Sequence, residues 1–188
     1  MRGLKPTSTT TLGPKRFELL RELAPRAATV VALLDPRSSG DAAEVRNAAD
    51  TLGLPLRVLP ATNDQEIDNA FHVMARERLE ALLIISNPLF TDRREQIVTL
   101  ANHRRIVTVY PRREYAAVGG LLSYGASIKD AYRQSGVYAG RILSGAKPAE
   151  LPVLQPTLFE LVLNLRTAKA FGPEISPMLL ARADEVIE

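Results

Sequence analysis

The sequence contains no cysteine and only two histidines. The absence of cysteine excludes disulfide bonds and thiolate chemistry in this chain. His72 and His103 have no second metal-ligating residue three or four positions further along, a spacing that would place two ligands on one helix face. We therefore expect surface histidines, no metal site and no cofactor.

Long apolar runs and long basic runs are also missing. No apolar run approaches the about 20 residues that a membrane-spanning helix needs, and residues 1–5 lack the apolar core of a signal peptide, so we expect none in this chain. The formal net charge is only +3, and the basic residues stand in short runs among acidic ones. Nucleic acid is not an expected partner, because binding it needs many clustered phosphate contacts.

The motifs of nucleotide-binding and hydrolytic enzymes do not occur either. The chain has no G-x-x-x-x-G-K-[ST], no G-x-G-x-x-G and no G-x-S-x-G sequence. Asp35 follows the first expected strand, whereas the phosphate-accepting aspartate of a receiver domain would follow the third, where Ser86 and Asn87 stand. We expect no catalytic residues, and a doubly wound enzyme is the weaker alternative.

What the sequence does contain is an alternation of apolar runs and helical patterns in its first 110 residues. Strands are expected over residues 29–34, 54–59, 81–85 and 106–109. Uninterrupted apolar runs are typical of parallel strands covered on both faces, and the alternation favours a parallel sheet with right-handed crossovers. We expect residues 30–34 and 81–85 to be the central, most buried strands.

The segment of residues 105–127 ends this alternation. After Val109 it breaks into a charged loop over residues 110–115, and a second apolar run follows Gly119 and Gly120. Further elements are expected as a helix over residues 128–143, a strand over 159–165, a short helix from Thr167 and a last helix over 178–186.

Ligands of open parallel sheets bind beyond the carboxyl ends of the strands. The loops that follow these ends, residues 35–39, 60–63, 86–90 and 110–115, offer hydroxyls, an amide, aromatic rings and paired charges. This mixture suits a small polar or amphipathic ligand, because rings stack, arginine binds carboxylates and acidic groups bind amines. Each residue taken singly can also be explained as a turn former or a helix cap.

Four stretches of the chain, residues 15–36, 75–90, 105–153 and 155–172, resemble a known family. They are similar to the ABC transporter substrate-binding protein family typified by tryptophan-binding TrpX-like lipoproteins, and the resemblance extends over residues 13–188. Its most specific part is the series YGAS, GAKPAELPVLQPT, FELVLNL and TAKA. The resemblance implies a periplasmic-binding-protein type I fold, in which two α/β lobes close around a ligand.

By this resemblance the chain holds the second lobe and not the first. Residues 1–13 are expected as a linker or disordered start, and 14–118 as the α/β ligand-binding lobe. Residues 119–150 are expected as a crossover segment and helix belonging to the missing first lobe, and 151–188 as the return strand and helices. The expected fold class is α/β, a Rossmann-like three-layer αβα lobe with a parallel sheet and a crossover helix from the partner lobe.

The resemblance also implies a function, that of the solute-binding component of an ABC-type importer. Its ligand would be a small molecule such as an amino acid, its partner an ABC transporter permease, and the parent family is periplasmic or membrane-associated and extracytoplasmic. The ligand-binding residues of the second lobe fall on Asp35, Ser38, Asn87, Tyr110, Arg112, Glu114 and Tyr124. The alternative is the ligand-sensing effector domain of a regulator, although nothing resembling a helix-turn-helix precedes Pro14.

The helix expected over residues 128–143 carries an apolar stripe. Its members recur at helical spacing and are Ile128, Ala131, Tyr132, Ser135, Ala139 and Ile142, and Leu121, Leu122 and Tyr138 are expected to extend it. Each large apolar side chain left in water gives up about 1.5–3 kcal/mol of burial. We therefore expect a homodimer through residues 121–143, and the alternative is a helix that folds back on its own lobe or stays mobile.

Overall fold

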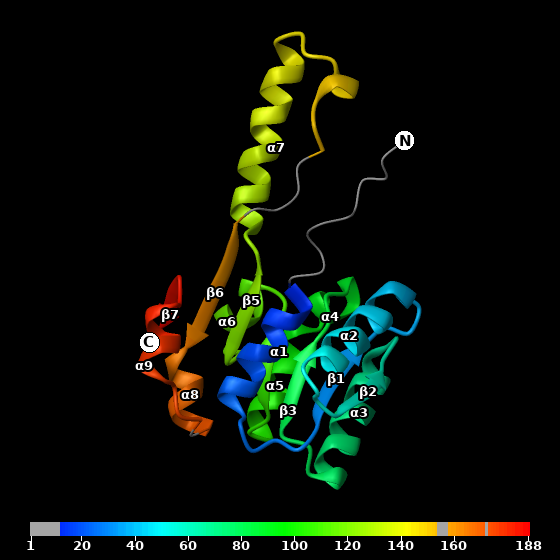
Figure 1. The fold of residues 1–188 in the computed structure, drawn as a ribbon, viewed down its shortest axis with the longest axis vertical. Helices are drawn as coiled ribbons and strands as arrows, with labels where there is room; N and C mark the ends of the chain where they lie inside the picture. The colour runs from blue at the N-terminus through cyan, green and yellow to red at the C-terminus, as the bar shows by residue number, and fades with distance from the viewer. Residues whose placement is uncertain (1–11, 154–157, 172) are drawn as a thin grey trace.

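The structure, a computed structural model, describes residues 12–153, 158–171 and 173–188. Its described residues form a seven-stranded sheet in the order β2-β1-β3-β4-β5-β6-β7 (Figure 1). The strands are β1 (Val30–Leu34), β2 (Leu56–Pro60), β3 (Ala81–Ile84), β4 (Val107–Tyr110), β5 (Leu122–Ala126), β6 (Phe159–Asn164) and β7 (Glu185–Ile187). The first five are parallel, β6 runs antiparallel to β5, and β7 is parallel to β6. The α/β class with a mostly parallel sheet is confirmed.

Strands β1 and β3 are neighbours inside the sheet, and every residue of both is buried. This confirms that the two uninterrupted apolar runs form interior strands. The middle strand of the seven is nevertheless β4, because the chain adds β5, β6 and β7 on its far side. Burial on both faces explains why these runs show no alternation of polar and apolar residues.

Helices cover both faces of the sheet, so the lobe has three layers (Figure 1). One face packs on α1 (Leu12–Leu23), α2 (Ser39–Thr51), α8 (Leu165–Phe171) and α9 (Pro177–Ala181). The other packs on α3 (Asp64–Glu77), α4 (Pro88–Asp92), α5 (Arg94–His103) and α6 (Arg113–Ala117). Side chains of β1 alternate between the two cores, as the strand geometry requires: Ala32 joins the first and Val31 the second.

Three predicted elements differ from the structure. Residues 88–90 of the loop expected over 86–90 form the start of α4. The charged loop expected over residues 110–115 contains the start of α6, because Tyr115 turns inward and its ring stacks on Tyr110 at 5.0 Å between centroids. The last helix ends at Ala181 instead of residue 186. The residues expected to form the end of this helix form β7 instead. Asp184 positions β7 beside β6, because its backbone N–H donates to Leu161 O at 2.8 Å and its carboxylate accepts the Leu161 N–H at 2.7 Å.

The turn between α6 and β5 depends on glycine. Gly119 has a φ of +102°, and a Cβ on Gly120 would lie 2.7 Å from the Tyr110 ring. The chain then enters β5, which pairs with β4 and β6. Residues 122–126, which the sequence assigned to the crossover segment, therefore lie in the sheet of this lobe. Leu121 and Leu122, expected to extend an exposed apolar surface, are instead buried in its core.

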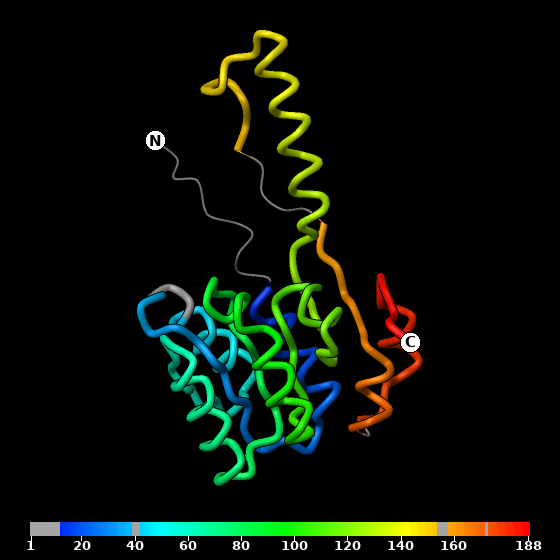
Figure 2. Tube along the Cα trace, turned by 180° about the vertical axis from the view of Figure 1, so that it is seen from behind, coloured from blue at the N-terminus to red at the C-terminus, as the bar shows by residue number. Residues whose placement is uncertain are grey.

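Beyond β5 the chain leaves the lobe. Helix α7 (Ile128–Leu143) and a short 3-10 helix (Pro148–Glu150) project away from the sheet, and β6 leads the chain back (Figure 2). Every residue of α7 is at least partly exposed. None of the helices in the described part of the chain is long and apolar enough to cross a bilayer.

Candidate ligand-binding site

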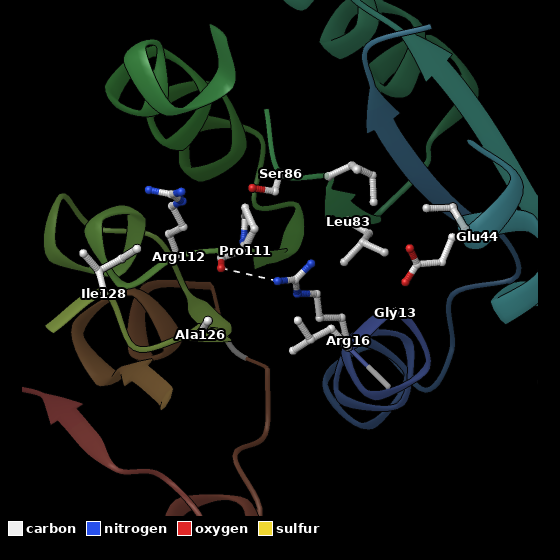
Figure 3. A pocket seen from close by; sticks show the side chains of 12 residues that line it. Gly13, Arg16, Glu44, Leu83, Ser86, Pro111, Arg112, Ala126 and Ile128 are labelled. Atoms are coloured by element: carbon white, nitrogen blue, oxygen red, sulfur yellow. Dashed lines mark hydrogen bonds between the residues drawn. The ribbon is translucent and has the colours of Figure 1, made fainter. Parts of the chain in front are cut away.

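A cavity of about 220 Å³ opens at the carboxyl edge of the sheet (Figure 3). Its walls come from the first two turns of α1, from the second turn of α2 and from the ends of β3, β4 and β5. The lining residues are Leu12, Gly13, Arg16, Glu44, Val45, Leu83, Ile85, Ser86, Pro111, Arg112, Ala126 and Ile128. The cavity therefore lies where an open parallel sheet binds its ligands.

Gly125 lets β5 approach the end of β4 closely enough to close one side of the cavity. A Cβ at this position would lie 1.9 Å from Pro111 O, a backbone atom that no rotamer change can move. The same Cβ would lie 3.6 Å from Nη2 of Arg16. Position 125 therefore has no room for a side chain, because the ends of β4 and β5 and helix α1 meet there.

Arg16 of α1 provides the cationic group of the cavity wall. Its Nε donates to Tyr124 O at 2.7 Å and its Nη2 to Pro111 O at 3.4 Å. Burial lowers the pKa of Arg16 to about 10, partly opposed by the negative charge of Glu44. The guanidinium remains protonated at neutral pH and is held in one orientation by two backbone carbonyls.

The remaining walls are mainly apolar. Leu83 and Ile85 at the end of β3, Val45 of α2 and Ile128 at the start of α7 are the larger aliphatic side chains that line it. Arg112 also lines the cavity, but its guanidinium lies on the far side of Pro111 from Arg16 (Figure 3). Such a cavity, apolar with a few polar groups at set positions, suits a small amphipathic molecule.

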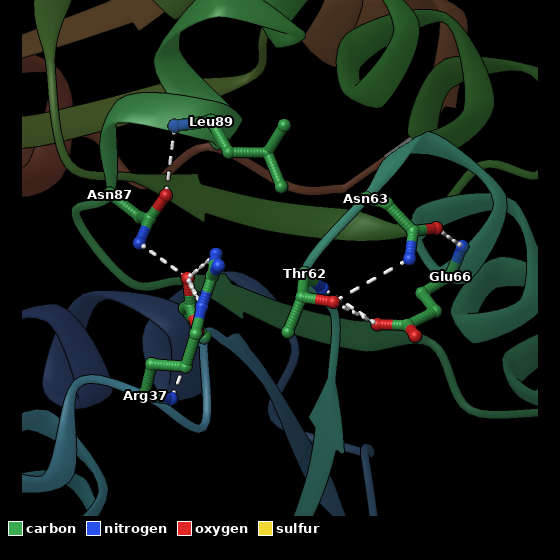
Figure 4. A network of polar contacts seen from close by, with 7 residues as sticks. Arg37, Thr62, Asn63, Glu66, Asn87 and Leu89 are labelled. Atoms are coloured by element: carbon green, nitrogen blue, oxygen red, sulfur yellow. Dashed lines mark hydrogen bonds and ion pairs between the residues drawn. The ribbon is translucent and has the colours of Figure 1, made fainter.

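A polar network follows the ends of β1 and β3 (Figure 4). The carboxylate of Asp35, a residue that is only 5% exposed, forms a bidentate ion pair with Arg37. The Nε–Oδ1 distance is 2.9 Å and the Nη2–Oδ2 distance is 2.6 Å. Asn87 donates to Oδ2 at 3.2 Å, and its own Oδ1 caps α4 by accepting Leu89 N–H at 2.8 Å. The Arg37 side chain and its backbone N–H lower the pKa of Asp35 to about 2.

The loop after β2 has its own capping network in the same view (Figure 4). Asn63 accepts the backbone N–H of Glu66 at 3.0 Å and begins α3. The Glu66 carboxylate reaches back to the Thr62 backbone N–H at 2.7 Å and its hydroxyl at 2.9 Å, which lowers the pKa of Glu66. The polar groups of this loop therefore serve the helix start.

The seven predicted ligand-binding residues are not brought to one point. Arg112 lines the cavity, whereas Asp35 and Asn87 belong to the network with Arg37. Ser38 precedes α2 and makes no side-chain capping bond. Tyr110 is fully buried beneath α6, away from the cavity, and burial raises its pKa.

Two further predicted residues reach the site indirectly or not at all. Tyr124 contributes its backbone carbonyl to Arg16, while its ring lies 6.2 Å from that of Phe159. Glu114 of α6 has a buried Oε2 without a hydrogen-bond partner among the described residues.

Sequence reasoning missed Arg16 and Glu44. A signal for Arg16 was present, because it stands four residues before the fully buried Leu20, at the spacing of one helix face. A charge on the apolar face of a helix marks a buried cation. In the part of the chain that the structure describes, no three His, Cys, Asp or Glu side chains gather where they could hold a metal ion.

The described residues thus form a layered α/β lobe with a cavity at the carboxyl edge of its sheet, the edge at which proteins with open parallel sheets bind ligands. The sequence matches the family described as ABC transporter substrate binding protein over residues 8–187, and the chain belongs to that family. The family is one of substrate-binding proteins and not of enzymes. A search of the curated proteins found no match.

Solved structures of three proteins share the fold. A conserved domain protein from Vibrio cholerae superposes with a TM-score of 0.82 at 21% identity, over 93% of this chain and 60% of that one. An ABC domain from Streptococcus pneumonia in complex with L-Trp gives 0.81 at 23% identity, over 94% and 62%. A ligand-free, open substrate binding protein with adhesive properties from Clostridium difficile gives 0.69 at 17% identity, over 93% and 59%. The chain thus spans about 60% of the length of the first of these proteins.

Proposed function

We propose that this chain is the ligand-binding lobe of the solute-binding component of an ABC-type importer, and that its solute is a small molecule such as an amino acid. The observation that carries the proposal is the cavity at the carboxyl edge, which combines the oriented cation of Arg16 with apolar walls. Family membership and the L-Trp held by one structural neighbour support the same role.

The proposal includes the partners and the place of action. A first lobe would close over the carboxyl edge, and α7 and the 3-10 helix would pack within it. Support comes from this projecting helix, in which no residue is buried, and from the length of the structural neighbours, of which the chain spans about 60%. The closed protein would deliver its solute to a permease outside the cytoplasm, as the family does.

Binding can be tested on the 188-residue chain itself. We expect that titrating the ¹⁵N-labelled protein with each of the common L-amino acids will shift the amide signals of Gly13, Ser86 and Arg112, which line the cavity. Binding should be weak, because one lobe supplies only part of the contacts. Amides at the opposite edge of the sheet, such as that of Glu80, are the internal control. If no amino acid shifts the cavity signals up to its solubility limit, the amino-acid proposal fails.

A further inference from the structure

We infer that Arg16 is the anchor for an anionic group of the ligand, a carboxylate carried on a small apolar body. The inference rests on the proposed function in that it concerns the same cavity. It assigns recognition of the ligand's negative charge to a residue of α1, whereas the sequence analysis expected the binding residues in the loops that follow the strands.

The orientation of Arg16 is set before any ligand arrives. Its Nε and Nη2 are occupied by the carbonyls of Tyr124 and Pro111, which fix the plane of the guanidinium. Its Nη1 makes no hydrogen bond to any residue that the structure describes. A planar cation held in this way presents its remaining donors to an acceptor without losing further side-chain freedom.

The charge of the cavity favours an anion. Among the described residues no carboxylate lies within 4.0 Å of the Arg16 guanidinium. The lining contains two cations, Arg16 and Arg112, and one acidic residue, Glu44, whose negative charge acts on Arg16 without an ion pair closer than 4.0 Å between the two. A ligand anion would therefore replace part of the hydration that Arg16 loses on burial. The electrostatic attraction between the two charges is stronger in a half-enclosed site than in open water.

The walls define the rest of the ligand. Leu83, Ile85, Val45 and Ile128 line the same cavity of about 220 Å³ and give it aliphatic surface. That volume accommodates a small molecule with one ring or a branched alkyl group. The matching chemical class is a small organic carboxylate with an apolar side group, of which an apolar amino acid is one member.

A matched pair of probes tests this assignment in the wild-type chain. 3-Phenylpropionate carries the carboxylate and the ring, and 3-phenylpropionamide differs only in having no charge. We expect NMR titrations to give an affinity for the acid at least about tenfold higher than for the amide, because a charge-assisted hydrogen bond is lost. The difference should shrink as salt is added.

Two variants locate the effect. Arg16→Gln should lower the affinity for the acid about tenfold or more and leave that for the amide unchanged. Arg21→Gln is the matched control, because Arg21 is an exposed arginine on the same helix. Thermal unfolding will show whether each variant is folded. If Arg16→Gln does not fold, the difference in affinity between acid and amide in the wild-type chain decides whether the cavity prefers an anion.

The outcomes separate the inference from the proposed function. If an amino acid binds but acid and amide bind equally, or if Arg16→Gln binds the acid like the wild type, the anchor is overturned and the solute-binding role stands. If 3-phenylpropionate binds in an Arg16-dependent way and no amino acid binds, the role of Arg16 as an anion anchor is supported. The proposal that the solute is an amino acid is then contradicted. If neither probe nor any amino acid binds, both fall.

Discussion

Asp35 shows how a single residue holds the carboxyl edge in shape. Its buried carboxylate joins the end of β1 to Arg37 and to the cap of α4 through Asn87. The network links two loops that belong to different strands. Its strength depends on the negative charge of Asp35, which makes it sensitive to acid.

We predict that acid weakens the fold through this group. The pKa of Asp35 is about 2 in the folded chain, below the ordinary value of about 3.9 in an unfolded one. The contribution is therefore fully present above about pH 4 and is lost as pH falls toward 2. Urea unfolding measured from pH 7 to pH 2 should give a larger free energy of unfolding for the wild type than for Asp35→Asn above about pH 4. This difference should disappear as the pH falls toward about 2. Asp50→Asn, at an exposed position on α2, should show no such change.

Gly125 provides a second test at the residue scale. We expect Gly125→Ala to destabilise the chain by about 1–3 kcal/mol or more, because the added methyl meets the backbone oxygen of Pro111. Gly136→Ala on α7 is the matched control, since a Cβ there meets nothing within 4 Å and alanine favours a helix by up to about 1 kcal/mol. Equal unfolding midpoints for the two variants in urea would contradict the close approach.

Among the elements, α7 stands apart from the lobe. It is anchored at its start, where Ser127 donates its backbone N–H to Leu158 O at 3.0 Å and its hydroxyl to Glu160 at 2.5 Å. Its apolar stripe has no cover within the described chain, and Tyr132 is 76% exposed and Ile142 41%. A helix anchored at one end with such a stripe needs a partner surface.

We predict that the isolated chain dimerises through α7. Light scattering should give a mass that rises with concentration above the 20.6 kDa of one chain, because two stripes can cover each other. Tyr132→Asp and Ile142→Asp should return the protein to monomer. Val137→Asp is the control, because it lies nine residues from Ile128, on the opposite side of the helix. A monomer mass at all concentrations would remove the dimer.

At the scale of the whole molecule, stability is unevenly distributed. The sheet and its two helical layers bury β1 and β3 completely, whereas α7 buries no residue. We therefore expect the cooperatively folded structure to end near the base of α7. This division matches the proposal that the projecting segment belongs with another lobe.

Hydrogen exchange should reveal the division. We predict that the amides of β1 and β3 exchange only through global unfolding, while those of α7 exchange through local opening at much lower cost. Mass spectrometry of peptic fragments in dilute protein would measure both. Protection of α7 equal to that of β3 in a proven monomer would show that the helix is stabilised within its own chain.

Part of the site was predictable and part was not. The loops after β1, β3 and β4 do lie at one edge, because parallel strands point the same way. Which side chains face the cavity could not be read from the sequence. Tyr110 turns into the core to stack on Tyr115, while Arg16, from a helix preceding every strand, enters the cavity.

The sequence by itself determined the layered α/β lobe, because uninterrupted apolar runs between amphipathic helices can be buried only inside a covered parallel sheet. Only the tertiary structure decided the far side of that sheet. There β6 returns antiparallel to β5, and β7 forms from a segment with a helical pattern, because the unpaired edge of β6 offers its backbone groups. Pairing between segments distant in the chain depends on which edge is free, and local periodicity does not encode that.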